Sequence, residues 1–498
     1  MPETSPRTRH ALAATLATSI IAGCIPTPPG GTARDPNREV PESYGGLRDT
    51  RNSGLIVWSE FFEDPHLTAL IETALRNNQE LNIAIQETWI ANSEIVARRG
   101  EYLPRLGFGL DGGVEHVGRF TSQGQSDEAN GVAATLQDYG FGLYASWEID
   151  VWGRLHDLAN AAAHRYLGSI EGRNLIVTRL VAEIASHYYE LMALDRQLEV
   201  VTDNIELQEN ALELVNAQFQ AGRATSLAMR RFEAELRDMQ SSQYAIQQRI
   251  VETENQLNFL AGRFPQPIER STLDFLALEP PEMSVGVPAQ LLENRPDIRQ
   301  AEHEMAAADL DVSAARAAFY PSLGIDGVIG FQSYDLTKLV TTPDSLLFGI
   351  FARIFAPILN RNGLKADYFR ANSQEMMAVL HYERAVLTAV IEVSNRVSLI
   401  RNLSQGYDLK EQQVEQLTQS IEISNQLFNS GRADYLEVLT TRKESLAAQI
   451  ELIEMKQRQM EATVTLYQAL GGGWRRSGLE PADGSDPEAA EESEEADR

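Results

Sequence analysis

Residues 153–221 constrain the fold of this chain more than any other segment, because they hold one long amphipathic pattern with no proline. From residue 177 onward, apolar side chains recur about every 3.5 residues, the spacing of a helix that packs in a coiled coil. A helix over this segment would be roughly 100 Å long at about 1.5 Å per residue, so it needs partner helices along its whole length. The apolar positions are Val177, Leu180, Ile184, Tyr188, Leu191, Leu194, Leu198, Val201, Ile205, Leu212, Val215 and Phe219, and Gln208 fills one step.

The same pattern occurs a second time, from Val386 to Phe428. Each copy ends in a similar motif: "FQAGRATSL" starts at Phe219 and "FNSGRADYL" starts at Phe428, 209 residues later. Glycine in this place suits the left-handed turn that ends a helix. We therefore expect Gly222 and Gly431 at the tips of two antiparallel helical hairpins.

Further helices are expected beside each long one. The returning helices should cover about 225–261, with Thr225 or Ser226 as the N-cap, and about 434–470, with Asp434 as the N-cap. Shorter helices, about 80–100 and about 297–318, precede the long ones. A short helix and a returning helix placed end to end nearly match a long helix in length, so each half of the chain is expected to hold one long helix beside two shorter ones.

The segments between the short and the long helices alternate like strands. Residues 105–150 alternate apolar with small or polar residues on both sides of the polar loop "TSQGQSDEANG". Residues 322–357 do so around "YDLTKLVTTPDS", and their last part, "LLFGIFARIFAPI", is apolar on both faces. Each copy therefore offers a hairpin of two strands, each about ten to twelve residues long, the length of a tilted transmembrane strand.

Four strands cannot close a barrel, and open sheet edges are not tolerated in lipid. Three copies of the chain would supply twelve strands and a closed ring. The alternative is a small water-exposed sheet that needs no oligomer. Aromatic residues near the strand ends favour the membrane: Tyr102, Tyr139, Trp147, Trp152, Tyr320 and Tyr334. The expected fold class is therefore mixed α/β: long helices beside shorter ones and four strands per chain, arranged as two internal repeats.

The N-terminus has the features of an export signal. Residues 1–23 begin with basic residues and continue with the apolar stretch "ALAATLATSIIAG". Cys24, the only cysteine, follows at once, and "IAGC" resembles a bacterial lipobox, so we expect a lipid on Cys24. The alternative is an incidental cysteine beside an ordinary signal peptide. Residues 24–54 are expected to form a tether, and the acidic residues 475–498 a disordered tail.

Other classes of function lack support in the sequence. The net charge of −28 argues against a nucleic-acid-binding protein, which needs a basic face. "GFGLDG" at 107–112 fits a dinucleotide fingerprint, but it lies inside a strand-like alternation and opens no helix. The eight histidines show no metal-binding spacing, and no nucleophile–base arrangement is legible. We therefore expect no enzyme activity, no cofactor and no metal.

Several motifs resemble those of one protein family. The longest, "VPAQLLENRPDIRQAEHEMAAADLDVSAARAAFYPSL" at 287–323, is similar to a signature of the TolC-like outer-membrane efflux proteins, in their lipoprotein branch. Residues 64–84, 146–155 and 469–474 also resemble recurring segments of that family. The domains are then a first repeat at 55–262, a linker at 263–295 and a second repeat at 296–474.

This resemblance implies a homotrimeric channel: a twelve-strand β-barrel in the outer membrane on a long α-helical barrel that extends into the periplasm and narrows to a gated tip. An inner-membrane pump would load it through an adaptor protein, and the cargo is not legible in the sequence. A structural coiled-coil lipoprotein without a pore is the alternative, and it would need no strand hairpins. The tip residues expected to touch the adaptor are Gly222, Arg223, Gly431 and Arg432.

The family also places an acidic gate just after the second tip. Alignment of the tip puts Glu437 and Thr440 at the two positions that often carry acids. Thr440 departs from the commoner aspartate, which leaves a gate of two acidic rings in question. Asp434 is a candidate for the second charge, with a role as N-cap only as the alternative. Arg432 and Lys443 are candidates for the ion pairs that close the gate.

Overall fold

The computed structural model describes residues 25–44, 51–430 and 432–475. The expected signal peptide, the lipid-attachment candidate Cys24, the tip residue Gly431 and nearly all of the acidic tail lie outside the described residues. The chain divides into two compact units. The first comprises Thr88–Ser169, Ala301–Tyr382 and the chain before Asn37; the second comprises Asn37–Glu87, Ile170–Gln300 and the chain from Glu383 onward. Each unit takes segments from both sequence repeats.

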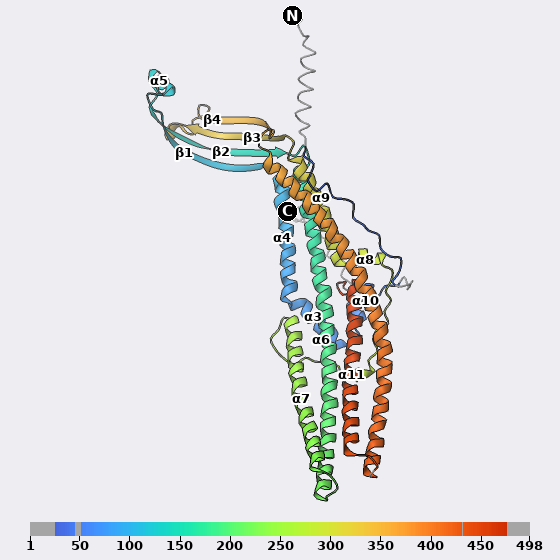
Figure 1. Cartoon of the computed structure of the whole chain (residues 1–498). Coiled ribbons are helices and arrows are strands. Elements are labelled where there is room, and N and C mark those ends of the chain that lie inside the picture. The colour runs from blue at the N-terminus through green and yellow to red at the C-terminus, as the bar shows by residue number, and fades with distance from the viewer. Residues whose placement is uncertain (1–24, 45–50, 431, 476–498) are drawn as a thin grey trace, which may run out of the picture. The chain divides into compact units, whose positions relative to one another are not determined.

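A four-stranded antiparallel sheet forms one part of the first unit (Figure 1). Its strands are β1 (Arg105–His116), β2 (Thr135–Ile149), β3 (Ser322–Ser333) and β4 (Leu346–Phe355), in the order β1-β2-β3-β4. The two expected hairpins are confirmed, although β2 is longer than predicted, at 15 residues. The hairpins join through β2 and β3, so β1 and β4 are the edges of the sheet.

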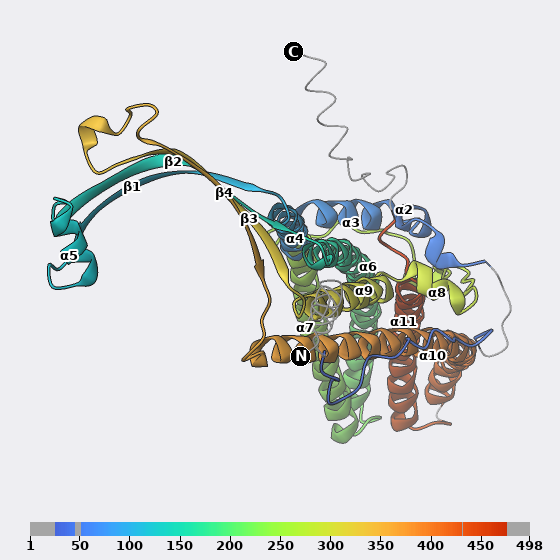
Figure 2. The same cartoon turned by 90° about the horizontal axis from the view of Figure 1, so that it is seen from above.

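The register of the sheet separates an apolar from a polar face. Apolar side chains lie opposite one another across the strands, as in Leu143 opposite Ile329, while Tyr144 and Val328 share the other face with charged and small residues. The sheet is strongly bent (Figure 2). Gly142 and Gly330 lie opposite each other, and a Cβ on Gly330 would come 2.3 Å from the carbonyl oxygen of Phe141. Only glycine permits this close approach of β2 and β3.

The expected polar loop between β1 and β2 contains a short helix, α5 (Ser122–Ala129). The Thr121 side chain caps it by accepting a hydrogen bond from the Gly124 N–H at 3.0 Å. At eight residues, the helix is too short to carry a periodic apolar pattern, and its sequence is polar throughout. The sequence prediction of a plain loop was wrong for this reason. The loop between β3 and β4 holds only the 3-10 turn η3 (Leu336–Lys338).

The helices follow the sequence expectation closely. The long helices are α6 (Arg154–Gln220) and α10 (Asn362–Asn429), each of which contributes to both units. The returning helices are α7 (Ser226–Leu260) and α11 (Tyr435–Ala469). α4 (Gln79–Glu101) and α9 (Pro296–Ala317) are the expected short helices. A further helix, α3 (Pro65–Asn77), precedes α4. The small elements of the second unit are η1 (Ser53–Leu55), α2 (Trp58–Phe61), η2 (Phe275–Ala277) and α8 (Ala289–Asn294).

The two helical seams differ in how well they are covered. Most of the α6 seam is buried in the core of the second unit, where Ile184, Tyr188 and Leu191 have no exposed surface. Gln208, at the polar step, is buried as well and donates to the Phe232 carbonyl at 3.1 Å. The α10 seam is half-buried from residue 397 to residue 421. One chain therefore leaves the second seam only partly covered.

A buried arginine in the longest family-like motif ties the helix ends of the second unit together. Arg295, just before α9, makes a two-point ion pair with Asp297, at 2.9 and 2.6 Å. It also donates to Glu392 of α10 at 2.7 Å and to the Ala469 carbonyl at the end of α11 at 3.0 Å. Burial opposes the charge, but the hydrogen bonds to Asp297 and the nearby carboxylates outweigh it and hold the pKa of Arg295 above its usual value.

Candidate functional site

The first hairpin tip, between α6 and α7, is a glycine-terminated helix end. Gly222 has φ +73°, the left-handed conformation expected from the sequence. The Arg223 N–H donates to the Gln218 carbonyl at 2.8 Å, which closes the end of α6. Thr225 then caps α7 by accepting a hydrogen bond from the Ala228 N–H at 3.2 Å. The Arg223 side chain is exposed.

The second tip, between α10 and α11, shares the hydrogen bond that closes the preceding helix. Arg432 follows the undescribed glycine, and its N–H donates to the Leu427 carbonyl at 2.9 Å, the bond equivalent to that of Arg223. Asp434 immediately precedes α11, but its side chain makes no capping hydrogen bond. Its carboxylate is therefore not committed to capping the N-terminus of α11. Arg432 and Asp434 are both exposed.

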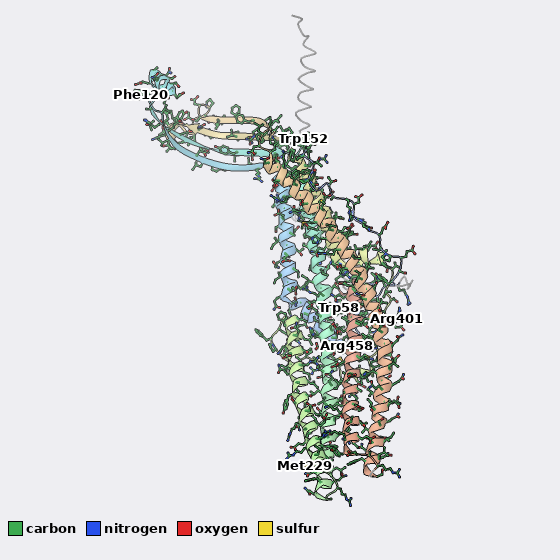
Figure 3. All side chains as sticks on the ribbon, viewed as in Figure 1. Trp58, Phe120, Trp152, Met229, Arg401 and Arg458 are labelled. Atoms are coloured by element: carbon green, nitrogen blue, oxygen red, sulfur yellow. The ribbon has the colours of Figure 1, made fainter. Side chains whose placement is uncertain are left out.

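The two hairpins pack together close to their tips. Val215, Ala228 and Phe232 of the first hairpin and Leu439 of the second form one buried cluster, in which none is more than 8% exposed. Met229, at the margin of this cluster, marks its place near the end of the α6–α7 hairpin (Figure 3). The cluster holds the first turns of α11 against α6 and α7.

The gate candidates lie on those same turns of α11. Glu437 is in the first turn of α11, three residues after the N-cap Asp434. Both are exposed, as is Thr440. Lys443 is already engaged within the chain, because its Nζ lies 3.3 Å from the Glu235 carboxylate of α7. The neighbouring Arg442 donates to the Leu207 carbonyl of α6 at 3.2 Å.

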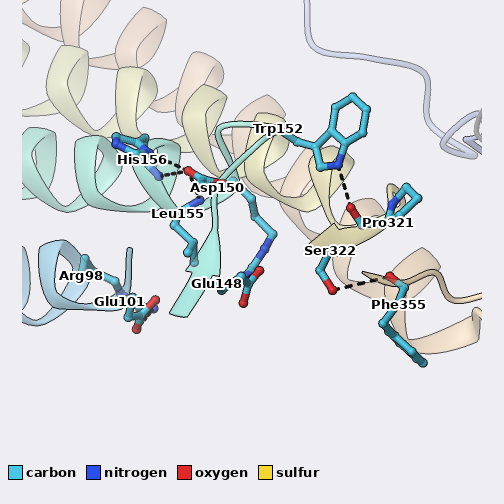
Figure 4. Close-up of polar contacts among 11 residues, drawn as sticks. Arg98, Glu101, Glu148, Asp150, Trp152, Leu155, His156, Pro321, Ser322 and Phe355 are labelled. Atoms are coloured by element: carbon cyan, nitrogen blue, oxygen red, sulfur yellow. Dashed lines mark hydrogen bonds and ion pairs between the residues drawn. The ribbon is translucent and has the colours of Figure 1, made fainter. Parts of the chain in front are cut away.

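Aromatic side chains make polar contacts at the base of the sheet in the first unit, and Figure 4 shows that of Trp152 with Pro321. The Trp152 indole donates to the Pro321 carbonyl at 2.8 Å, and its ring stacks on Tyr320 at 4.8 Å. Trp147 donates to the Tyr102 carbonyl at 2.9 Å. The sequence predicted aromatic residues at these strand ends, and such residues suit the boundary between lipid and water. Both indole N–H groups are satisfied by backbone carbonyls, which fixes the rings in place.

No helix in the described ranges is long and apolar enough to cross a membrane. No group of three or more histidine, cysteine or acidic side chains in that part of the chain is placed to hold a metal ion.

The sequence matches one family model, described as outer membrane efflux protein, over residues 70–263 and 287–472. These two segments cover more than half of the chain. The chain belongs to the outer membrane efflux protein family. The paired matches follow the two repeats of the fold, and the strand hairpins, which a coiled-coil lipoprotein without a pore would not need, are part of it.

Relatives in this family are similar over most of their length. The solvent efflux pump outer membrane protein SrpC of Pseudomonas putida is 30% identical over 438 residues, which are 87% of this chain and 91% of SrpC. The cation efflux system protein CusC of Escherichia coli is 27% identical over 84% of this chain and 88% of CusC. A crystal structure of CusC matches with a TM-score of 0.79 at 25% identity, over 89% of this chain and 99% of that one.

The fold is shared more widely in the family. The crystal structure of the open state of the Neisseria gonorrhoeae MtrE outer membrane channel matches with a TM-score of 0.79 at 24% identity, over 92% of this chain and all of that one. The protein is therefore an efflux channel protein of the outer membrane, in a family of channel proteins rather than enzymes.

Sequence reasoning did not find the contacts that join the two tips. Leu439 is one of many apolar residues on α11, and Glu235 is one of many acids on α7. Their partners lie more than 200 residues away in the chain, and no local spacing indicates such a pair. The only signal was the repeat itself, which implied that two similar tips exist.

Proposed function

We propose that three copies of this chain form one channel, with twelve strands closed into a β-barrel in the outer membrane. The observation that carries this proposal is the sheet, which has an apolar face and ends in two strands, β1 and β4, with unpaired edges. Unpaired backbone groups are too costly in lipid for the sheet to remain open there. The half-buried α10 seam also supports assembly, because neighbouring copies would cover it.

The internal repeat predicts how neighbouring copies pair. The pair Leu106–Ala145 of the first hairpin is equivalent to the pair Leu323–Ile354 of the second, so the two hairpins share one register. Within the chain, β2 meets β3 through pairs such as Leu143–Ile329. When the same equivalence is applied to that junction, Leu143 corresponds to Ala352 of β4 and Ile329 to Gly112 of β1. We therefore expect Ala352 of one copy opposite Gly112 of the next.

Disulfide trapping tests this register. Ala352→Cys combined with Gly112→Cys should give covalently linked trimers on mild oxidation in outer membranes. Ala352→Cys with Leu110→Cys or Val114→Cys should react much more slowly, because a shift of two residues moves the sulfur atoms apart by roughly 7 Å. Monomers from every pair would refute the closed ring, and preferred linkage through residue 110 or 114 would refute the register.

The tips are the proposed contact with a periplasmic adaptor, through which an inner-membrane pump delivers its cargo. Two features support this. Arg223 and Arg432 are exposed beside equivalent helix ends, and Leu227 and Leu436, at equivalent positions four residues later, are 57% and 41% exposed. A cationic and an apolar group thus recur together at both tips.

Photocrosslinkers placed at residues 223 and 432 should capture an adaptor subunit in cells. The same probe at Tyr244, exposed on α7 away from the tip, is the matched control. Capture from residue 244 with none from either tip would contradict tip docking.

Glu437 is proposed to form the gate, with Asp434 as the second acidic group. Thr440 is the third gate candidate and carries no charge. Three copies of Glu437 around a narrow axis would attract cations, as rings of carboxylates do in pores. Glu437→Ala should weaken cation selectivity, measured as the reversal potential under a salt gradient. It should also raise the leak conductance through the tip. Glu422→Ala, an exposed carboxylate on α10, is the control. Equal selectivity of wild type and Glu437→Ala would remove this residue from the gate.

Cys24 is the proposed site of a lipid that anchors the N-terminus in the outer membrane. The support is the lipobox-like "IAGC", which ends the expected signal peptide. Cys24→Ser should abolish palmitate labelling, with only partial loss from the outer membrane because the barrel is itself an anchor. A wild-type mature protein whose mass includes no acyl groups would refute this assignment.

A further inference from the structure

Strand β4 is apolar on both faces, and contact with lipid would explain only one of them. Phe348, Ile350 and Ile354 lie on the apolar face of the sheet. Leu347 and Phe351 lie on the opposite face, where Phe351 is the register partner of Asp326. In a closed barrel this second face would line a water-filled lumen, where apolar side chains gain nothing from burial. The Phe351 side chain is 62% exposed in the chain.

Glycines on the same face make room for two aromatic rings. A Cβ on Gly349 would lie 2.9 Å from the Phe351 ring, and a Cβ on Gly109 would lie 2.7 Å from the ring of Tyr144. Each ring therefore packs against the backbone of a strand, Phe351 at Gly349 and Tyr144 at Gly109. The Tyr144 hydroxyl is held in place by donating to the Asp111 carboxylate at 2.7 Å.

These rings border a hollow of about 530 Å³ on the sheet. Val328 and Phe351 give it an apolar floor, and Tyr144 adds an aromatic wall. Its volume is in the range of small-molecule sites, roughly 300–1,000 Å³. Every strand of the sheet contributes to its lining, so the hollow needs only a single chain.

Arg105, at the rim of the hollow, has no acidic partner among the residues that the structure describes. Asp326 is paired with Arg353 at 3.1 Å, and nearby Glu148 is paired with Arg154 at 2.8 Å. Arg105 lines both this hollow and the adjoining polar one, and it makes no ion pair within the described ranges of the chain. Its guanidinium is therefore free to bind an anion, and planar donor pairs suit carboxylates and sulfonates.

We infer that this hollow is a binding site for exported molecules that combine an aromatic or other apolar body with one negative charge. The body would lie on Phe351, Val328 and Tyr144, and the anionic group would pair with Arg105. This inference rests on the proposed trimeric channel, because only barrel closure turns this face toward the transported molecules. A trimer would hold three such sites at the helix-proximal end of the barrel, where β1 begins. Binding in an open, wet hollow is weak, which suits a conduit that must release its cargo.

The test uses the full-length protein in lipid nanodiscs and three probes of similar size. These are 1-naphthalenesulfonate, a naphthylmethyl-trimethylammonium cation, and the aliphatic hexanesulfonate. Equilibrium dialysis should show the aromatic anion bound more tightly than either of the others. Arg105→Gln should weaken its binding about fivefold, the loss of one exposed charge pair. Phe351→Leu should weaken it about threefold, the loss of one aromatic contact.

Two further variants separate binding from a damaged fold. Arg105→Lys keeps the charge and should bind more tightly than Arg105→Gln. Lys338→Gln removes one charge from the β3–β4 loop and should bind as the wild type does. Equal binding of the aromatic anion and cation, or equal affinity of wild type, Arg105→Gln and Phe351→Leu, would overturn the inference. Conductance and trimer formation are recorded on the same samples. A conducting trimer that does not bind the aromatic anion preferentially refutes only the inferred site. Absence of trimers refutes the proposed channel.

Discussion

Leu439→Ala should loosen the gate-bearing turns of α11 without unfolding the protein. Leu439 is 8% exposed and packs with Val215 and Phe232, which are 2% and 3% exposed. Truncation of a buried leucine to alanine costs about 2–5 kcal/mol through lost burial and the cavity that remains. This cluster lies near a hairpin end, where the helices can partly close over a cavity, so we expect about 2–3 kcal/mol. A free-energy loss of that size raises the local opening constant about 30- to 150-fold.

Hydrogen–deuterium exchange measures this opening directly. Backbone amides of residues 435–443 should exchange faster by about the same factor, while amides of the large core around Tyr188 remain protected. Ile423→Ala is the matched control, because Ile423 of α10 is 56% exposed and outside the cluster. It should change exchange in this segment by less than about threefold. Unchanged exchange in Leu439→Ala, or equal changes in both variants, would refute the view that this cluster holds α11 to the first hairpin.

Three further predictions follow from contacts in the second unit. Arg295→Lys loses the two-point pair with Asp297 and should destabilise the protein by about 3 kcal/mol, which a lowered melting temperature would reveal and an unchanged one would contradict. Gly222→Ala forces alanine into a left-handed conformation and should cost about 1 kcal/mol at the tip. The new Cβ causes no steric clash, because nothing lies within 4 Å of it. Limited proteolysis at the tip measures the effect, and equal cleavage rates of wild type and variant would count against it. A hydrogen bond from His187 lowers the pKa of Glu190, so the ionised carboxylate contributes stability above its unfolded pKa, and this contribution is lost as pH falls below about 4.5. Melting temperatures between pH 7 and pH 3 should fall less steeply for Glu190→Gln than for the wild type, and parallel curves would refute the link.

The sequence predicted the helices and strands well because long periodic patterns carry most of that information. The apolar spacing predicted a helix at 153–221, and α6 runs from Arg154 to Gln220. The alternation of Leu106, Phe108 and Leu110 predicted one face of β1, and the register confirms that these residues face one way. The sequence shows that β4 is apolar on both faces, but the register was needed to place Phe351 opposite Asp326.

What the sequence could not predict depends on single local contacts, on distant residues or on other copies of the chain. α5 is held by one threonine cap and by the close fit of Gly124 against the Gly118 backbone, neither of which has a periodic signal. The Lys443–Glu235 pair joins two hairpins that are adjacent only in the folded chain. The role of Glu437 depends on other copies of the chain, so its exposed position in one chain leaves that role a prediction.

In the proposed ring of three chains, the unequal loops between paired strands would have a consequence at the cell surface. The two hairpins share one register, so a ring of three chains would repeat nearly the same strand pair six times around its axis. The loops break this pattern, because only the β1–β2 loop carries α5. The mouth of the channel would then alternate between three bulky and three slender projections. An antibody raised against residues 118–131 should therefore bind three epitopes on each channel. A ligand that recognises only the strand pattern shared by the two hairpins would have six sites.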